Sequence, residues 1–367
     1  MLLKLLGEID AAACTSEVVS LTDIGPVGRQ IEGLGIRVQA LNMTRGMPDP
    51  TGLLRLRFIL RTIAPDVIQT WMYHADLVGG LAGKWAGSIP VVWNVRHSNF
   101  DPAADKWMTR ATARVCAWFS GSLPERIVSC SRTAAAVHAD LGYTASKVVI
   151  IPNGFDLHAF RPDPDMRISV RLELGIPEKS PVVGMVARLH PQKDHPTFFR
   201  AARSLLTEVP EAHAILCGSG IVAGGPLDLM MESFPQSLRS RVHLLGVRSD
   251  IPRLTAAFDL AVSSSAFGEA FSNSLGEALA AGVPCVTTDV GDSAWIVGDA
   301  GLIVPPQDAD SLAAAMKRFV DMTDGQRDHL RREARRRVEE NFDISMVADQ
   351  YLKLYRELHA ARLSGVN

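Results

Sequence analysis

The chain alternates short apolar runs with longer stretches in which apolar residues recur at the spacing of an amphipathic helix. Such runs, bounded by glycine, proline and small polar residues, are typical of buried strands. A first series lies at residues 17–22, 35–41, 66–71, 91–95, 126–130 and 147–151, and a second at 181–187, 212–217, 241–245, 260–265, 284–288 and 301–304. Helical patterns such as 53–63 and 133–141 separate them. Strands that alternate with helices predict an α/β protein with parallel sheets.

The two series predict two doubly wound domains. We expect a first domain at residues 1–155 and a second at 181–340, with a polar, proline-containing hinge at 156–180. A last helical pattern at 341–367 follows the second sheet. Ligands of open α/β sheets usually bind at the carboxyl ends of the strands. Two such domains are therefore expected to leave a ligand-binding cleft between those ends.

The first residues depart from this pattern. Residues 1–9 already have the spacing of an amphipathic helix, and the first strand run follows them. In a doubly wound sheet the first strand is normally central, and a phosphate-contacting loop comes after it. Two explanations stay open: the fold begins on a helix, or a first strand and its loop are missing upstream.

The composition of the chain reduces the number of protein classes to which it could belong. The 367 residues give room for two ordinary domains, and a hydrophobic content of 47% provides a core for each. A formal net charge of −2 gives no electrostatic reason to expect nucleic acid. Five cysteines without metal-like spacing favour a reducing compartment. The sequence has neither a bilayer-length apolar run nor a signal-peptide layout, so we expect a soluble cytoplasmic protein.

The most informative run is 268–289, in which Glu269 and Glu277 stand eight residues apart. The strand run 260–265 leads into a turn, and Ser272 is a good N-cap for the helix that follows. Glu269 then lies in the loop and Glu277 inside the helix. First-turn amides suit an anion, whereas carboxylates accept hydrogen bonds from hydroxyl groups. A phosphate beside hydroxyls describes a nucleotide sugar.

This run resembles the retaining family 4 glycosyltransferases, also called the group 1 glycosyl transferases, whose hallmark is Glu-x7-Glu. Residues 186–195 resemble the first loop of that family's nucleotide-sugar domain, 151–156 its Pro-Asn-Gly segment between domains, and 341–358 its closing helix. The likeness covers essentially the whole chain, and its motifs are specific jointly. It implies the GT-B fold: two Rossmann-like domains that face each other across a cleft, with the donor bound mainly by the second.

The resemblance places the donor site in the second domain. Arg188 and Lys193 enter a loop after a strand, where two cations can bracket a diphosphate and stabilise it as a leaving group. Glu277 is expected to accept hydrogen bonds from the donor ribose, and Glu269 to support the charged transition state. The alternative for Arg188, Lys193 and Glu277 is a solvated surface charge, and the alternative for Glu269 is a loop carboxylate that accepts from nearby amides. Further donor-side candidates are Gly184, Val247 and Arg248 at strand ends, Ala270, Phe271 and Ser272 in the loop, and Asn273, Ser274 and Leu275 through first-turn amides.

On the acceptor side, two loops of the first domain carry histidines. His74 and His97 each follow a strand run, which places both at the cleft edge. His97 matches a family histidine near the transferred sugar or acceptor, while His74 and Arg96 are further acceptor-side candidates. Structural roles stay open for both histidines. No carboxylate cluster accompanies them, and the resemblance implies catalysis without a metal or other cofactor.

The last candidate for a functional role is a basic, aromatic stretch of the first domain. It comprises Lys106, Trp107, Arg110, Arg114, Trp118 and Phe119. Such a stretch is typical either of a surface that touches an anionic membrane carrying a lipid-linked acceptor, or of a helix that is half core and half solvated.

These expectations converge on a hexosyltransferase-type enzyme that moves a sugar from a nucleotide-diphosphate donor, with a UDP-sugar favoured, to a hydroxyl with retained configuration. The family implies a front-face substitution in which the leaving diphosphate helps to deprotonate the acceptor. Two alternatives stay open: a nucleotide-sugar epimerase, and a non-catalytic nucleotide-sugar-binding relic if the first strand is absent. The resemblance favours bacterial exopolysaccharide, lipopolysaccharide or capsule assembly as the setting.

Overall fold

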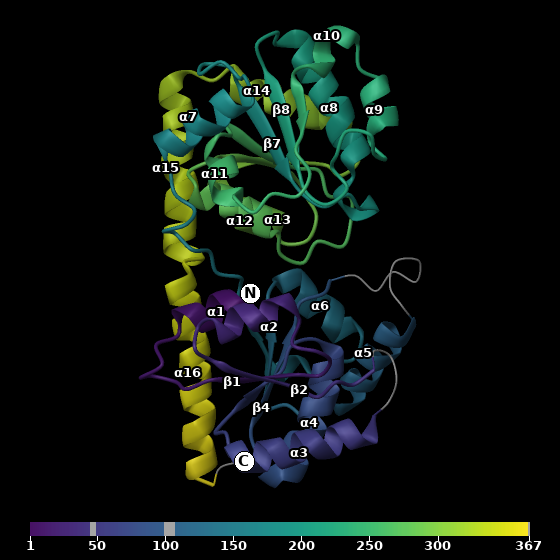
Figure 1. Cartoon of the computed structure of the whole chain (residues 1–367), viewed down its shortest axis with the longest axis vertical. Coiled ribbons are helices and arrows are strands. Elements are labelled where there is room, and N and C mark those ends of the chain that lie inside the picture. Colours follow the sequence, from purple (N-terminus) through teal and green to yellow (C-terminus); the bar gives the residue numbers. More distant parts are fainter. Residues whose placement is uncertain (45–48, 99–106, 366–367) are drawn as a thin grey trace. The chain divides into compact units, whose positions relative to one another are not determined.

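The computed structural model describes residues 1–44, 49–98 and 107–365 (Figure 1). It divides into two compact units, Met1–Gly154 with Ile344–Asn367 and Phe155–Asp343. Each unit contains parallel β-structure and helices that alternate with the strands along the chain. The predicted α/β class with two Rossmann-like domains is therefore confirmed.

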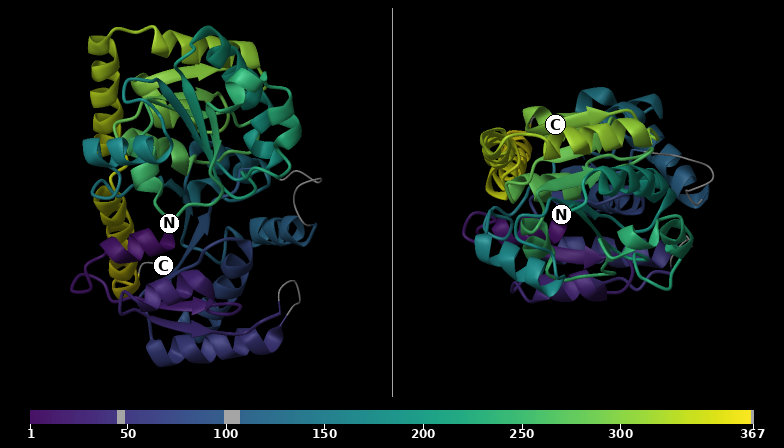
Figure 2. Two further views of the ribbon diagram at one scale, coloured as in Figure 1. Left: turned by 45° about the horizontal axis from the view of Figure 1, so that its top comes forward. Right: turned by 90° about the horizontal axis from the view of Figure 1, so that it is seen from above.

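The second unit is built on one six-stranded parallel sheet with the spatial order β12-β11-β10-β7-β8-β9. Figure 2 gives two further views of the strands and helices of this unit, coloured from teal to yellow. Its strands are β7 (Val182–Val186), β8 (His213–Cys217), β9 (Val242–Leu244), β10 (Leu260–Ser263), β11 (Cys285–Thr288) and β12 (Gly301–Val304). The chain winds outward from β7 through β8 to β9 and then returns to place β10 on the other side of β7. The switch point of this sheet, where ligands of such folds bind, therefore lies between β7 and β10.

Helices of the second unit pack a large apolar core against this sheet. They are α7 (Pro164–Glu173), α8 (His195–Glu208), α9 (Asp228–Glu232), α10 (Gln236–Arg239), α11 (Ile251–Ala256), α12 (Asn273–Ala280), α13 (Ser293–Val297), α14 (Ala309–Val320) and α15 (Asp324–Asn341), with short 3₁₀ turns η2 (Pro191–Lys193) and η3 (Gly298–Ala300). The buried Phe198 and Leu205 of α8 share one cluster with Leu312 and Met316 of α14. Because these residues recur at helical spacing, each helix turns one apolar stripe inward.

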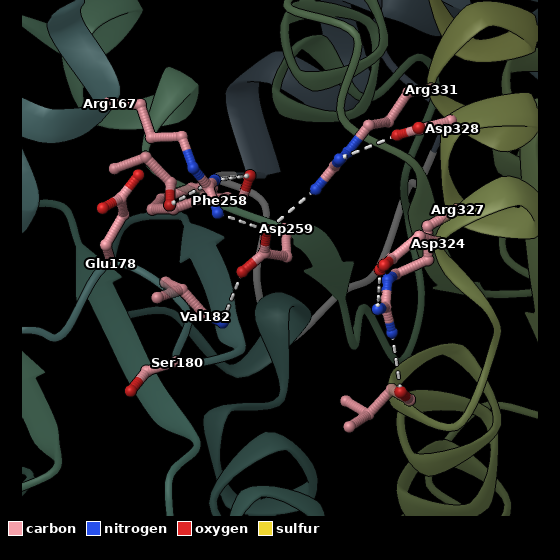
Figure 3. Close-up of polar contacts among 12 residues, drawn as sticks. Arg167, Glu178, Ser180, Val182, Phe258, Asp259, Asp324, Arg327, Asp328 and Arg331 are labelled. Carbon is pink, nitrogen blue, oxygen red and sulfur yellow. Dashed lines mark hydrogen bonds and ion pairs between the residues drawn. The ribbon is translucent and has the colours of Figure 1, made fainter. Parts of the chain in front are cut away.

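Residues 156–180, which we expected to form a hinge, belong to the second unit and contain α7. Arg171 of α7 is buried, and its guanidinium donates to Asp259 at 2.7 Å. The same carboxylate accepts from Arg167 at 2.6 Å and from Arg331 at 3.0 Å, and its other oxygen accepts from the amide of Val182 at 2.9 Å (Figure 3). The polar side chains that suggested a linker in the sequence therefore anchor the segment to the start of β7.

The two ends of the second unit lie side by side. The amide of Phe155 donates to the carbonyl oxygen of Phe342 at 2.8 Å, and Phe155 forms a parallel β-bridge with Asp343. The chain therefore enters and leaves this unit at one place.

The first unit holds its parallel strands in two separate sheets. β1 (Glu17–Ser20) pairs with β2 (Arg37–Ala40). The other sheet has the order β3-β4-β5-β6, formed by Ile68–Gln69, Val91–Val95, Arg126–Ser129 and Val148–Ile150. Among the described residues no β-ladder joins β1 to β3.

Helices of the first unit come from both ends of the chain. They are α1 (Leu2–Glu8), α2 (Gly25–Glu32), α3 (Pro50–Ile63), α4 (Tyr73–Gly87), α5 (Trp107–Phe119), α6 (Arg132–Asp140) and α16 (Ile344–Leu363), with a 3₁₀ turn η1 (Ala145–Lys147). The last helix, α16, drawn in yellow in Figure 1, packs beside α1 and buries Val347 and Tyr351 in a cluster with Leu5 and Val92. Within the described part of the chain, no helix has both the length and the apolar character needed to cross a bilayer.

Candidate functional site

The strand ends at the switch point of the second unit bring two distant loops together. β7 ends at Val186, and its loop continues through Arg188 to Lys193; β10 ends at Ser263, and its loop continues to Glu269. Because β7 and β10 are paired parallel neighbours, both loops leave the same edge of the sheet. The loops that carry the predicted cations and the predicted carboxylate therefore lie at one edge of the sheet, where Lys193 reaches Glu269.

Lys193 and Glu269 form an ion pair between Nζ and Oε2. The Oγ of Ser265 donates to the same carboxylate oxygen at 3.0 Å, and the carbonyl of Ser265 accepts in turn from Thr288 Oγ1 at 2.6 Å. The side chains of Lys193 and Glu269 are only 16% and 10% exposed. Water screens such a pair weakly, and removal of one partner would leave an uncompensated, largely buried charge.

Two residues that we did not single out from the sequence tie the loops to each other. Gln192 accepts from the amide of Ala266 at 2.9 Å, and its side-chain amide donates to the carbonyl of Gly268 at 2.8 Å. Ser264 Oγ donates to the carbonyl of Lys193 at 2.8 Å. The only signal in the sequence was the run of serines that ends the strand. These bonds fix the approach of Lys193 to Glu269 before any ligand binds.

A glycine that sequence reasoning also missed lies directly against Glu269. Gly291 has a φ of +61°, and a Cβ at this position would come within 1.6 Å of the carbonyl oxygen of Glu269. Glycine alone combines this left-handed backbone with so close an approach. The loop after β11 therefore packs directly against the backbone of Glu269.

The helix predicted after Glu269 is present as α12. Ser272 occupies the predicted N-cap position, but its Oγ lies 3.3 Å from Ser274 Oγ and caps no first-turn amide among the described residues. Donors at a helix start that lack a side-chain cap suit an anion. Asn273 is exposed in this first turn, and Glu277 is half-buried one turn further on.

Three donor-side candidates next to Glu269 turn their side chains into the core. Ala270, Phe271 and Leu275 are buried, and the ring of Phe271 lies 6.1 Å from that of Phe155 and 6.0 Å from that of Trp295. Only the backbone of these three residues is therefore suited to a ligand, and their side chains hold the start of α12 on the unit.

Gly184 has a packing role within the sheet. It lies within β7, and a Cβ there would come within 2.3 Å of the ring of Phe258. Close packing of the sheet against this ring accounts for the glycine, and its role as a donor-binding residue stays a prediction.

Arg188 and Arg248 differ in whether their guanidinium groups have partners. Arg188 is exposed, and the described residues give its guanidinium neither a hydrogen bond nor an ion pair. Arg248 is paired with Asp250 at 2.6 Å and with Glu173 at 2.7 Å, contacts that raise its pKa further and lower the pKa of Asp250. The guanidinium of Arg248 is therefore occupied, which leaves the backbone of this segment and the exposed Val247 for contact with a base.

In the first unit, Arg96 has structural contacts, and the acceptor-side role that we expected for it stays a prediction. Its guanidinium donates to Asn153 Oδ1, donates to the hydroxyl of Tyr351 at 3.1 Å and lies 4.5 Å from the ring centre of Trp71. Arg96 therefore fastens the helix α16 to the end of β4.

The two histidines lie on different elements of the first unit. His97 is half-buried just after β4, and His74 is exposed in the first turn of α4, with Nε2 3.5 Å from Thr112 Oγ1. Met72 precedes this turn with φ +73° and ψ 159°, a conformation that costs a non-glycine residue roughly 1–3 kcal/mol. In the parts of the chain that are described, no three His, Cys, Asp or Glu side chains gather where they could hold a metal ion.

Behind His74 lie buried polar groups that the sequence did not reveal. Burial raises the pKa of Asp76 to about 7, against the opposing hydrogen bond from Thr70 Oγ1 at 2.5 Å. Burial lowers the pKa of His138 to about 4, so this ring is neutral at pH 7. Its Nδ1 lies 2.7 Å from the carbonyl of Ala134 and must donate to it, so Nε2 accepts from the hydroxyl of Tyr73 at 3.0 Å.

Comparison with solved structures identifies the fold of this chain. The Anabaena protein HepE in complex with UDP aligns with a TM-score of 0.81 at 22% identity, over 97% of this chain and 95% of that chain. A glycosyltransferase from Rickettsia africae aligns with a TM-score of 0.83 at 18% identity, over 97% and 93% of the two chains. At these identities the likeness shows the fold alone, and the fold is the predicted GT-B architecture of two Rossmann-like domains.

Sequence comparisons then give the family. A model for Glycosyltransferase Family 4 matches residues 2–159, and one for Glycosyl transferases group 1 matches residues 180–322. A D-inositol 3-phosphate glycosyltransferase from Salinispora tropica is 30% identical over 340 residues, which cover 85% of this chain and 69% of that protein. The UDP-Gal:alpha-D-GlcNAc-diphosphoundecaprenol alpha-1,3-galactosyltransferase of Escherichia coli is 26% identical over 84% of this chain and 80% of its own. The chain belongs to the group 1 glycosyltransferases, as its motifs predicted.

Proposed function

We propose that this glycosyltransferase uses a UDP-sugar donor and transfers the sugar, with retained configuration, to a hydroxyl of a lipid-linked saccharide in bacterial exopolysaccharide, lipopolysaccharide or capsule assembly. The observation that carries the proposal is the buried Lys193–Glu269 pair at the switch point, immediately before the anion-accepting start of α12. The solved UDP complex of HepE, and the UDP-Gal donor and GlcNAc-diphosphoundecaprenol acceptor of the E. coli relative, support the choice of UDP and of a lipid carrier.

Donor binding uses the two cations that follow β7. Arg188 is exposed and has no partner among the described residues, so it meets a diphosphate without breaking an existing contact. Lys193 exchanges its bond with Glu269 for a phosphate oxygen, and the first-turn amides of α12 hold the other phosphate. The ion pair therefore keeps Lys193 in place while the site is empty.

The same exchange prepares the reaction. The bond between the anomeric carbon and the diphosphate oxygen breaks, and the acceptor oxygen bonds to that carbon on the same face while its proton passes to the departing diphosphate. Arg188 and Lys193 stabilise the negative charge that grows on the leaving group, and Glu269, released from Lys193, faces the positive charge on the sugar. Half-buried Glu277 accepts from the ribose hydroxyls.

A nucleotide-release assay with UDP-, GDP- and ADP-sugars tests this proposal. We expect Lys193→Ala to lower kcat by roughly 10²–10³-fold, the usual effect of removing one group that stabilises transition-state charge. Lys317→Ala is the matched control, because Lys317 pairs with Asp321 on the exposed face of α14. Unchanged turnover of Lys193→Ala would refute the assignment.

The same assay separates the alternatives. An epimerase would convert the donor to an epimer without acceptor, and a non-catalytic relic would release no nucleotide from any of the three donors. We also propose that transfer needs no metal, so turnover is expected to be unchanged by a chelator; a loss that added Mg²⁺ restores would contradict this.

We further propose that the first unit contacts an anionic membrane through α5. Trp107, Arg114 and Trp118 recur at helical spacing and therefore share one face, and the two tryptophans are 69% and 85% exposed. Exposed tryptophan beside arginine is typical of a helix that lies at a lipid interface. Arg110 of the same stretch is half-buried, and Lys106 lies outside the described residues.

A further inference from the structure

The carboxylate of Glu269 has two hydrogen-bond donors of different kinds. Lys193 Nζ and Ser265 Oγ both reach its oxygen Oε2, Ser265 at 3.0 Å. Within residues 1–44, 49–98 and 107–365, no third group donates to this side chain. Lys193 is charged and lies on the loop after β7, whereas Ser265 is neutral and lies, like Glu269, on the loop after β10. The two donors can therefore be lost one at a time.

Ser265 is fixed in its place by two neighbouring loops. The residue is fully buried, and its carbonyl oxygen accepts from Thr288 Oγ1 at 2.6 Å. Thr288 is also fully buried and is the last residue of β11. On the other side, the amide of Ala266 donates to the carbonyl of Gln192 at 2.9 Å. The hydroxyl of Ser265 is therefore held beside Glu269 whether or not a ligand is present.

Lys193 differs from Ser265 because only its backbone is held. Its carbonyl oxygen accepts from Ser264 Oγ at 2.8 Å, and its amide donates to the carbonyl of His190 at 2.9 Å. The side chain beyond these bonds is a flexible four-carbon stem, and it is 16% exposed. Of the two donors, only Lys193 can turn toward a ligand without breaking the backbone contacts of its loop.

The departure of Lys193 from Glu269 has a cost. The side chain of Glu269 is only 10% exposed, so water can replace little of the lost contact. A largely buried carboxylate without a partner is strongly destabilising. A hydrogen bond from a hydroxyl to a carboxylate is stronger than one between neutral groups. The bond from Ser265 is the one that stays, and it therefore lowers the cost of the departure.

We propose that Ser265 is a positioning residue for donor binding, whose hydroxyl holds the carboxylate of Glu269 while Lys193 is drawn to the diphosphate. The inference rests on the proposed function, in which Lys193 exchanges Glu269 for a phosphate oxygen. Ser265 acts through Glu269 and not by contact with the donor. Because the exchange takes place when the donor binds, Ser265 sets the affinity for the donor and not the rate of the chemical step.

Titration calorimetry of UDP binding to the whole chain tests this role without catalysis. We expect Ser265→Ala to weaken UDP binding by about tenfold or more, because the complex loses a hydrogen bond to a charged group. The KM for the UDP-sugar is expected to rise by a similar factor, while kcat at saturating donor changes much less.

Ser311→Ala is the matched control. The hydroxyl of Ser311 also donates to a carboxylate oxygen, that of Asp308 at 2.6 Å, in the same unit. This bond lies after β12, the strand at the edge of the sheet, and not at the switch point. We therefore expect Ser311→Ala to bind UDP like the wild type.

A double substitution separates a role through Glu269 from a general loosening of the loop. Glu269→Gln keeps the shape of the side chain but removes the charge that Lys193 leaves behind, so UDP is expected to bind more tightly than to the wild type. In that background we expect Ser265→Ala to change the UDP affinity by less than about twofold, the usual scatter of such cycles. Equal weakening by Ser265→Ala in both backgrounds would indicate a loosened loop and overturn the proposal.

Lys193→Ala separates failure of this inference from failure of the proposed function. Weaker UDP binding by Lys193→Ala but not by Ser265→Ala would refute the role of Ser265 alone. Unchanged affinity in both variants would refute the proposed donor contact, and the inference with it. If Ser265→Ala does not fold, Ser265→Cys replaces it, because a thiol of nearly the same shape is a weaker donor. Ser265→Cys is then expected to weaken UDP binding, and wild-type affinity would contradict the role.

Discussion

The two units build their parallel sheets from similar strands, but only the second closes its sheet completely. In the second unit β7 lies between β8 and β10, and the continuous ladder carries Lys193 and Glu269 to one edge. In the first unit β1 and β3 border a cavity instead. The comparison shows that a continuous sheet fixes its strand-end loops, whereas the first unit depends more on helix packing and on contacts such as those of Arg96.

The two units also differ in how their buried carboxylates are compensated. Asp259 of the second unit is ion-paired with Arg171, Arg167 and Arg331, so its negative charge is compensated. Asp76 of the first unit accepts hydrogen bonds from neutral groups, and burial raises its pKa to about 7. A paired charge anchors a fold over a wide pH range, while an unpaired one makes stability depend on pH.

The largest expected effect comes from breaking the paired charge. Arg171→Leu leaves Asp259 with fewer partners and is expected to destabilise the second unit by about 3–5 kcal/mol. Amide exchange in increasing urea, read separately on β7 and β4, reports each unit. Arg253→Leu, which removes the ion pairs of Arg253 with Asp250 and Glu173, is the control and is expected to cost under about 1 kcal/mol. Equal losses for the two variants would contradict the assigned role of Arg171.

The second expected effect is a difference between the two units in how their stability depends on pH. In the first unit, Asp76 with its raised pKa binds a proton more tightly when folded, so its contribution to stability falls between about pH 4 and 7 as pH rises. His138, whose pKa is lowered to about 4, contributes the opposite slope between about pH 6.5 and 4. The two slopes oppose each other, so the stability of the wild-type first unit is expected to change little over that range.

Asp76→Asn removes one of these slopes. The first unit of the variant is expected to lose about 1.4 kcal/mol per pH unit on acidification from pH 6.5. The second unit is the internal reference, because burial lowers the pKa of both His195 and His213 to about 4 and it loses stability on acidification in both proteins. Urea unfolding midpoints of each unit, measured from about pH 4.5 to about 8, test this expectation, because these groups titrate over that range. A variant whose first unit keeps the wild-type pH profile would show that Asp76 titrates normally.

A smaller effect tests the packing role of Gly184 against its predicted role in donor binding. Gly184→Ala forces a methyl group against Phe258 and is expected to cost about 1–3 kcal/mol in the second unit, with the affinity for nucleotide retained. Gly325→Ala is the matched control, because a Cβ there meets open space on α15. Lost nucleotide binding at full stability would restore Gly184 to the donor site.

The smallest effect on folding is expected at the surface of the first unit. Trp118→Ala removes an exposed ring and is expected to change stability by under about 0.5 kcal/mol. It is expected to weaken flotation with vesicles of anionic lipid, most visibly at low salt. Leu229→Ala, at an exposed apolar position of the second unit, is the control. Vesicle binding that both variants retain in full would exclude this face of α5 as the membrane contact.

Local patterns were enough to predict most elements and part of the site. The strand runs and the N-cap position of Ser272 depend on neighbouring residues, so the start of α12 was predicted correctly, although the Ser272 side chain caps no first-turn amide among the described residues. The helix α7 was missed because its polar face, including Arg171, pairs with residues far away in the sequence.

Within the site, sequence spacing placed Lys193 and Glu269 on loops that meet, since both follow neighbouring strands. It did not reveal Gln192 and Gly291, because their roles arise only where separate loops touch. The raised pKa of Asp76 was equally hidden, since it results from burial and not from a charged neighbour in the chain.

Because its two ends are adjacent, the second unit can be exchanged between proteins as one continuous segment. Phe155 and Phe342 are hydrogen-bonded, so residues 155–343 begin and end at one point. Segments whose ends lie this close are the ones that tolerate insertion and transplantation. Exchange of this single stretch between relatives would transfer the Lys193–Glu269 loops intact and leave α16 with its own host. Recombination at two sites, one β-bridge apart, would then suffice to exchange this unit as a whole.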